Sequence, residues 1–146
     1  RSRGLGDVYK RQNRGRISNI SSSALHFGKQ WNKKSTLVGE ALIPRQVRFQ
    51  DKFHSISLVW KENVIAFYLN NSSNPYFTIN SNHPEFQKYK YPFNRDYYMI
   101  LNVAVGGKYD DYWVDFDAFC NDEECSNKED PDSHRFIIDW IEYERL

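Results

Sequence analysis

The sequence predicts an all-β fold of the sandwich type, and three features lead to that prediction. Apolar and polar residues alternate with period two in most apolar segments, which is typical of half-buried strands. Clusters of Asn, Ser, Pro and Gly separate these segments at short intervals. Aromatic residues make up 16% of the 146 residues, and so many rings require a core that buries them. No apolar run approaches the roughly 18 residues of a membrane span, so we expect a globular protein and not a membrane protein.

The first twelve residues, RSRGLGDVYKRQ, are expected to be foreign to the domain, which we place at residues 13–146. They show no apolar period and resemble translated adaptor sequence of the kind that contaminates reading frames assembled from environmental reads. Residues 1–16 hold six basic residues and one acid, which leaves the rest of the +1 chain at −4. A nucleic-acid-binding arm is the alternative interpretation, but aromatic residues are not interleaved with these charges.

The N-terminal half of the domain is predicted to contain four strands. Ser23–Phe27 and Leu37–Ile43 are the first two. Phe53–Trp60 and Val64–Leu69 alternate on either side of the turn residues 61–63, and this pattern predicts a β-hairpin.

The C-terminal half is predicted to add three strands and one long loop. Turn residues 70–75 precede a short strand at Tyr76–Ile79, and residues 80–96 are expected to form an ordered loop without a helix. Tyr97–Val105 is the most apolar segment and is expected to be a central strand. Phe136–Tyr143 is expected to be the closing strand.

An acidic segment, residues 110–132, holds ten acids and one lysine, a net charge of −9, and we interpret it as a solvated loop. It contains the two cysteines of the chain, Cys120 and Cys125. A zinc site needs four ligands, so this spacing favours a small disulfide over a metal site, and the bonding state stays open.

Aromatic side chains could form either the core or a binding surface. Trp60 and Trp140 are expected in the core. Sugar rings have apolar C–H faces that stack on aromatic rings, so rings beside glycines and charges are candidates for a carbohydrate surface. These candidates are Trp31, Tyr109, Tyr112 and Trp113.

Ile100–Gly107, ILNVAVGG, resembles a strand of glycoside hydrolase family 16, in particular its laminarinase-like endo-β-1,3-glucanases. Ser23–Gly28, SALHFG, is similar to the histidine-bearing strand that follows the catalytic strand of that family. Ile138–Tyr143, IDWIEY, is similar to its final strand. The resemblance covers residues 17–146 and the C-terminal half of the family's domain. It implies a jelly-roll β-sandwich of the concanavalin A-like lectin and glucanase type, here incomplete.

The resemblance also implies a retaining hydrolase that cleaves β-1,3-glucosidic bonds of laminarin-like polysaccharides. Retention needs two carboxyl groups about 5–5.5 Å apart, which the family places on one strand as Glu-x-Asp-x-x-Glu. That motif is absent from this chain, so we expect no catalytic residue here and no activity from the chain itself. A non-catalytic β-glucan-binding protein is the alternative.

Several residues match substrate-binding positions of the family. His26 matches an active-site histidine, and Asn102 interrupts an apolar strand where its amide can face the cleft. Tyr109 stands where the family often has Trp, and Trp31 and Trp113 complete the candidate substrate-binding set.

No cofactor is required by this resemblance. Asp139 matches a closing-strand Asp that can bind a structural calcium. The implied partner is a β-glucan, with no nucleic acid and no membrane, and the complete protein is expected to be a monomer. Enzymes of this kind act outside the cell, so a secreted, extracellular or periplasmic location is expected.

Overall fold

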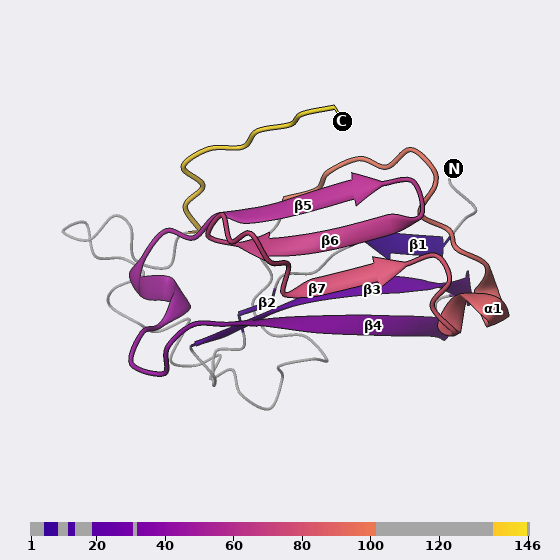
Figure 1. The fold of residues 1–146 in the computed structure, drawn as a ribbon, viewed down its shortest axis with the longest axis horizontal. Helices are drawn as coiled ribbons and strands as arrows, with labels where there is room; N and C mark the ends of the chain where they lie inside the picture. Colours follow the sequence, from indigo (N-terminus) through magenta and orange to yellow (C-terminus); the bar gives the residue numbers. More distant parts are fainter. Residues whose placement is uncertain (1–4, 9–11, 14–18, 31, 102–135, 146) are drawn as a thin grey trace, which may run out of the picture. The chain divides into compact units, whose positions relative to one another are not determined.

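The computed structural model describes residues 5–8, 12–13, 19–30, 32–101 and 136–145, and the chain divides into two units, residues 1–97 and 98–146. All regular elements among the described residues lie in the first unit (Figure 1). They are β1 (Leu5–Val8), β2 (Gln12–Asn13), β3 (Ile20–Gln30), β4 (Lys33–Leu42), a 3-10 turn (Phe49–Asp51), β5 (Ile56–Lys61), β6 (Val64–Leu69), β7 (Phe77–Asn80) and α1 (Glu85–Tyr89).

The strands form two antiparallel sheets. In the first sheet β4 pairs along one edge of β3 from Ile20↔Leu42 to Gln30↔Lys33. On the other edge of β3, β1 pairs with residues 25–28 and β2 with residues 21–22. The second sheet has the order β5-β6-β7. The prediction of a mostly β protein is therefore confirmed, and its strands form small antiparallel sheets.

One core joins the two sheets. Leu25 and Phe27 of β3 are buried together with Ile65 and Phe67 of β6. Ile79, Phe86 and Phe93 complete this buried cluster. Burying a side chain of this size contributes roughly 1.5–3 kcal/mol, so the cluster is the main apolar contribution to holding the sheets together.

The predicted hairpin is confirmed as β5 and β6. Asn63 in its turn has φ 64°, a left-handed conformation that Asn tolerates better than most residues. The Asn63 N–H donates to Oδ1 of Asn94 at 3.1 Å, and Nδ2 of Asn94 donates to Oδ1 of Asn63 at 2.9 Å. This reciprocal pair fixes the turn against the segment that follows α1.

The strands predicted at Ser23–Phe27, Leu37–Ile43 and Tyr76–Ile79 are also confirmed, with boundaries that differ by a few residues. Residues 80–96, predicted as a loop without a helix, contain the five-residue helix α1. A helix of little more than one turn produces no readable period. It forms because Phe86 packs on Phe27, with ring centroids 4.7 Å apart.

Two predicted strands are wrong over the residues that the structure describes. Residues 98–101 and 136–145 contain no strand, and Met99 (66%) and Trp140 (59%) are exposed, so Trp140 is not a core residue either. An alternating segment becomes a strand only when a neighbour bonds its backbone, and neither segment has such a partner among the described residues. The remainder of Tyr97–Val105, residues 102–105, lies outside the described residues.

Trp60, the other tryptophan expected in the core, packs against it half-buried. Its ring lies 5.0 Å from the ring of Tyr97, and its Nε1–H donates to the backbone oxygen of Phe93 at 2.9 Å. That bond satisfies the polar edge of the indole, so the prediction for Trp60 is confirmed.

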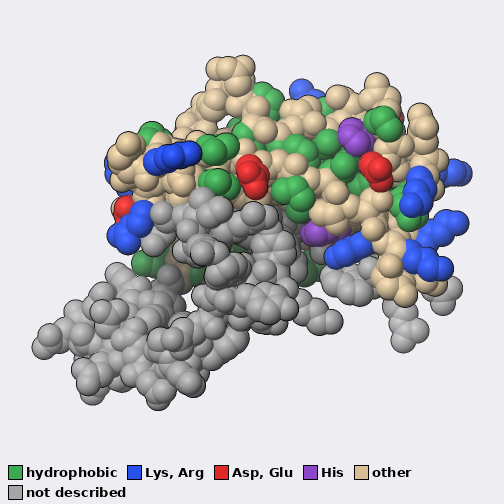
Figure 2. Space-filling model, turned by 90° about the horizontal axis from the view of Figure 1, so that it is seen from below, with side chains coloured by type: hydrophobic (Ala, Val, Ile, Leu, Met, Phe, Trp, Pro, Cys, Tyr) green, Lys and Arg blue, Asp and Glu red, His purple; other side chains and the backbone are tan. Residues whose placement is uncertain are grey.

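Among the described residues of the first unit, Lys and Arg side chains gather at the end where α1 and the turn between β3 and β4 lie (Figures 1 and 2).

A single glycine sets the spacing between the sheets at one point. A Cβ atom at Gly39 of β4 would overlap the ring of Phe77 on β7. Phe77 in turn stacks on Phe67 of the core, with ring centroids 5.5 Å apart. Only glycine at this position lets the ring lie against the β4 backbone.

We expect Gly39→Ala to lower the free energy of unfolding by about 1–3 kcal/mol, because it overpacks this contact. Urea denaturation measures the change. Phe77→Leu in the Gly39→Ala background should recover part of the loss, and strictly additive effects of the two substitutions would contradict the contact.

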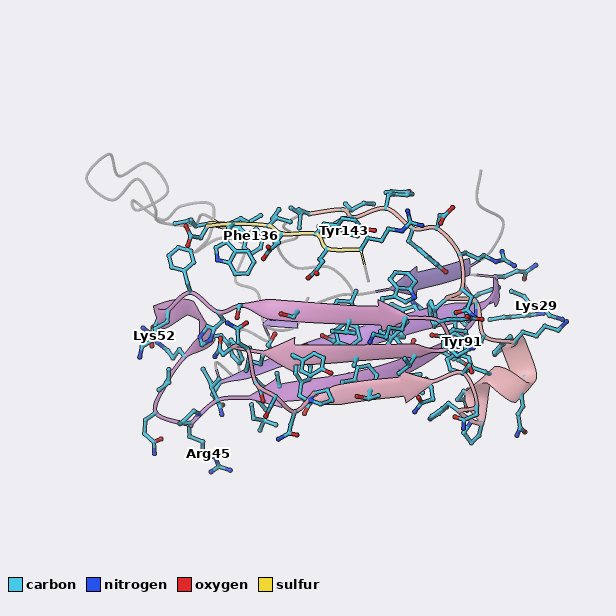
Figure 3. The ribbon with its side chains drawn as sticks, turned by 45° about the horizontal axis from the view of Figure 1, so that its top comes forward. Lys29, Arg45, Lys52, Tyr91, Phe136 and Tyr143 are labelled. Carbon is cyan, nitrogen blue, oxygen red and sulfur yellow. The ribbon has the colours of Figure 1, made fainter. Side chains whose placement is uncertain are left out.

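Tyr91, labelled in Figure 3, carries a buried hydroxyl that has no hydrogen-bond partner among the described residues. Its ring packs edge-on against Phe86 and Phe93, at centroid distances of 5.0 and 5.4 Å. Burial, with a smaller contribution from Tyr97, raises the pKa of Tyr91 from 10.0 to about 12. The ring contributes packing, while the hydroxyl is buried without compensation.

We expect Tyr91→Phe to leave the free energy of unfolding at pH 7 unchanged or higher, because it removes an unbonded buried hydroxyl. The raised pKa of Tyr91 means that the folded state holds this proton more tightly. Stability is therefore retained below pH 10 and lost as pH rises toward 12. The variant should lose less stability over that interval in urea titrations. Tyr98→Phe, at a side chain that is 82% exposed, is the control, and a clear loss at pH 7 for Tyr91→Phe would contradict the assignment.

Candidate functional site

The candidate site lies on the outer face of the first sheet, which we define as the side of β3 and β4 turned away from the core. Leu25 and Phe27 point into the core, so the alternate residues of β3 point outward. These outward residues are Ser22, Ala24 and His26, and their partners on β4 are Glu40, Val38 and Thr36. The three β4 residues are exposed, whereas Ser22 and Ala24 are buried.

His26 is the predicted site residue that the structure places on this face. Its Nδ1 shares a hydrogen bond of 2.8 Å with the hydroxyl of Thr36, directly across the strand pair. The imidazole is half-buried, and this bond fixes its orientation on the sheet.

The strand on the other side of β3 is β1, whose residue Asp7 is the backbone register partner of His26. It is the one acidic residue within β1. Glu40 lies opposite Ser22, four residues from His26, a separation of about 13 Å along the strand. Glycosidases need two carboxyl groups about 5–5.5 Å apart for retention or 6.5–9.5 Å apart for inversion. The backbone positions of Asp7 and Glu40 lie on opposite sides of β3 and four residues apart along it, so they are too far apart to form such a dyad.

Metal-binding groups do not gather in the described part of the chain, where no three His, Cys, Asp or Glu side chains come together. Asp139, the calcium candidate, is exposed in the second unit. The calcium site therefore stays a prediction.

The other predicted site residues lie outside the described residues. They are Trp31, Asn102, Tyr109, Trp113 and the cysteines Cys120 and Cys125. The binding roles of the first four and the disulfide stay predictions.

Thr36 was missed by the sequence analysis. It lies one residue before the strand predicted at Leu37–Ile43, and only the observed register of β3 and β4 places it opposite His26. An isolated threonine carries no sequence signal for such a contact.

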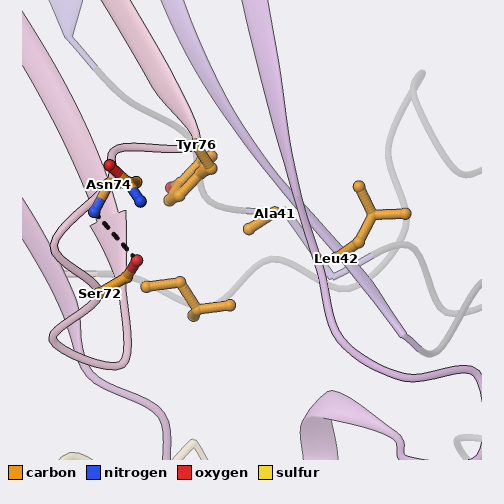
Figure 4. A pocket seen from close by; sticks show the side chains of 6 residues that line it. Ala41, Leu42, Ser72, Asn74 and Tyr76 are labelled. Atoms are coloured by element: carbon orange, nitrogen blue, oxygen red, sulfur yellow. Dashed lines mark hydrogen bonds between the residues drawn. The ribbon is translucent and has the colours of Figure 1, made fainter.

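A separate small pocket of about 250 Å³ lies between the end of β4 and the turn that joins β6 to β7 (Figure 4). Tyr76 in its wall shares a hydrogen bond of 2.6 Å with the hydroxyl of Ser23. The other lining residues are Ala41, Leu42, Leu69, Ser72 and Asn74. None of the lining side chains is a carboxylate, imidazole or thiol, so the pocket offers no acid–base chemistry near neutral pH.

Among the described residues, no helix has the length and apolar character that a membrane span requires.

Comparison with known proteins finds one informative relative. The chain is 30% identical over 112 residues to glucan endo-1,3-beta-glucosidase A1 of Niallia circulans, an alignment that covers 72% of this chain and 16% of the relative. This is distant homology, and the chain spans about a sixth of the relative's length. No protein-family model matches the sequence. No solved structure matches it either.

Proposed function

We propose that this chain is part of a retaining glycoside hydrolase of family 16 that cleaves β-1,3-glucosidic bonds in laminarin-like polysaccharides. The observation that carries the proposal is the similarity to an endo-1,3-β-glucanase over 72% of the chain. The complete domain would be a jelly-roll β-sandwich that acts outside the cell. A structural calcium at Asp139 and a cleft lined by Trp31, Asn102, Tyr109 and Trp113 belong to the same proposal.

The position of His26 supports this proposal. The family resemblance puts the catalytic strand just before the histidine-bearing strand, and β1 pairs with β3 beside His26. A strand at that position with the sequence Glu-x-Asp-x-x-Glu would direct two carboxylates to one face, because residues four apart in a strand share a face. His26 would then bind a sugar hydroxyl beside them.

In the proposed mechanism, one glutamate of the complete enzyme attacks the anomeric carbon and the other protonates the departing glycosidic oxygen. The second glutamate then removes a proton from water, which hydrolyses the glycosyl–enzyme bond with net retention. In this chain β1 has the sequence Leu-Gly-Asp-Val and supplies neither glutamate. His26 and Thr36 contribute hydrogen-bonding groups to binding and no catalytic group.

A non-catalytic β-glucan-binding protein is the second candidate, favoured by the absence of Glu-x-Asp-x-x-Glu from the chain. Both candidates predict binding of β-glucan to the face that carries His26, and they differ in catalysis.

We expect His26→Ala to weaken laminarin binding about three- to tenfold, the equivalent of one lost hydrogen bond. Affinity electrophoresis in laminarin gels measures the change. Thr78→Ala, an exposed threonine of β7, is the matched control and should leave binding unchanged. Wild-type affinity for the His26 variant, with an unchanged melting temperature, would contradict the assigned face.

We also expect the 146-residue chain to release no reducing sugar from laminarin, because both catalytic glutamates are absent. Measurable release by the purified chain would overturn the mechanism. Sequencing the coding region upstream of Ser23 separates the two candidates. An intact Glu-x-Asp-x-x-Glu supports the enzyme, and a strand there without both glutamates supports the binding protein.

A further inference from the structure

Five exposed lysines near α1 and the turn between β3 and β4 form what we call the lysine cluster. Figure 2 shows Lys and Arg side chains at this end of the first unit. Three of the five lysines come from the end of β3 and the start of β4, and two from the last turn and C-cap of α1. They are Lys29, Lys33, Lys34, Lys88 and Lys90.

Packing between the helix and the first sheet brings these lysines together. The ring of Phe86 in α1 lies 4.7 Å from Phe27 in β3, and the ring of Tyr89 lies 6.2 Å from it. On the β4 side, the hydroxyl of Ser35 donates to Oε2 of Glu85 at 2.9 Å. The helix is therefore anchored to both strands. Its contact on β3, Phe27, lies two residues before Lys29, and its contact on β4, Ser35, follows Lys34 directly.

Basic residues outnumber acids in the two described segments that carry the cluster. Residues 28–35 and 85–91 together hold five lysines and one acid, Glu85, whose carboxylate is already engaged with Ser35. Within the part of the chain that the structure describes, Lys29, Lys33, Lys88 and Lys90 form no ion pair. Like charges gathered on one part of a folded surface attract anions.

We propose that the lysine cluster binds an anionic polysaccharide that carries sulfate or carboxylate groups along its chain. This inference rests on the proposed function, since it extends the ligand from a neutral glucan to a charged glycan. Ammonium groups are compact point charges with rotatable donors, and they suit anionic groups spaced along a flexible polymer.

The composition of the cluster favours a glycan over a nucleic acid. Residues 28–35 and 85–91 hold no arginine to form a bidentate contact with a base edge. Tyr89, a ring of α1 beside the cluster, is half-buried, and the ammonium of Lys88 lies over it at 5.0 Å from the centroid. Single-stranded nucleic acids need open rings on which their bases can stack, and Tyr89 does not offer its ring in that way.

The experiment compares dextran sulfate with uncharged dextran as probes of the full 146-residue chain, by fluorescence anisotropy at several salt concentrations. The test variant is Lys29→Gln/Lys33→Gln. Its matched control is Arg45→Gln/Lys52→Gln, which removes the same charge at the opposite end of the first unit (Figure 3). All four side chains are exposed, so both variants should fold.

We expect the chain to bind dextran sulfate and not dextran. The lysine variant should weaken this binding at least fivefold and reduce its salt dependence by the contribution of about two released counterions. The control should change affinity less than twofold. Equal losses in both variants, no loss in the lysine variant, or no binding to dextran sulfate would each overturn the proposal. Tighter binding of a DNA duplex at equal charge concentration, weakened by the same lysine variant, would overturn it in favour of a nucleic acid.

Laminarin binding by the same proteins separates this inference from the proposed function. Laminarin is uncharged, so the lysine variant should bind it as the wild type does. If the wild-type chain binds laminarin but does not bind dextran sulfate, only the lysine cluster proposal is contradicted. Binding of dextran sulfate without any binding of laminarin contradicts the β-glucan function while leaving the polyanion site supported.

Discussion

Burial of Phe27 is the interaction on which the first unit depends. Its ring contacts Phe86 at 4.7 Å and Phe93 at 6.1 Å, and it shares the core with residues of both sheets. Burying a phenylalanine contributes roughly 1.5–3 kcal/mol, which exceeds the few tenths of most surface contacts. Since side chains alternate along a strand, fixing Phe27 inward also fixes its neighbour His26 outward. A shift of one residue would bury the histidine and expose the phenylalanine.

The same contact organises the end of the unit. Because Phe86 packs on Phe27, α1 forms where the sequence shows no helical period, and its lysines come to lie beside those of β3 and β4. Two surfaces of different chemistry result. The outer face offers hydroxyl and imidazole groups suited to a neutral sugar, and the lysine cluster offers charge. Binding at the first should depend little on salt, and binding at the second should depend on it strongly.

The two wrong strand predictions follow from the need of every strand for a neighbour. Residues 98–101 are all apolar, as β6 is, and six of residues 136–143 are apolar, yet both segments are exposed and unpaired among the described residues. Val64–Leu69 forms a strand because β5 and β7 flank it and bond both of its edges. Apolar character therefore indicates the capacity to form a strand, and a partner decides whether it forms.

The sequence by itself determined the hairpin of β5 and β6, strands β3, β4 and β7, and His26 as a candidate residue. These depend on local alternation, on turn residues such as Asn63, and on short motifs. Only the tertiary structure decided the fit of Phe77 against Gly39, the partner of His26, the helix at Glu85–Tyr89 and the gathering of five lysines. Each of these features depends on contacts between residues that lie roughly ten to sixty positions apart in the chain. A local pattern carries no information about contacts at that separation.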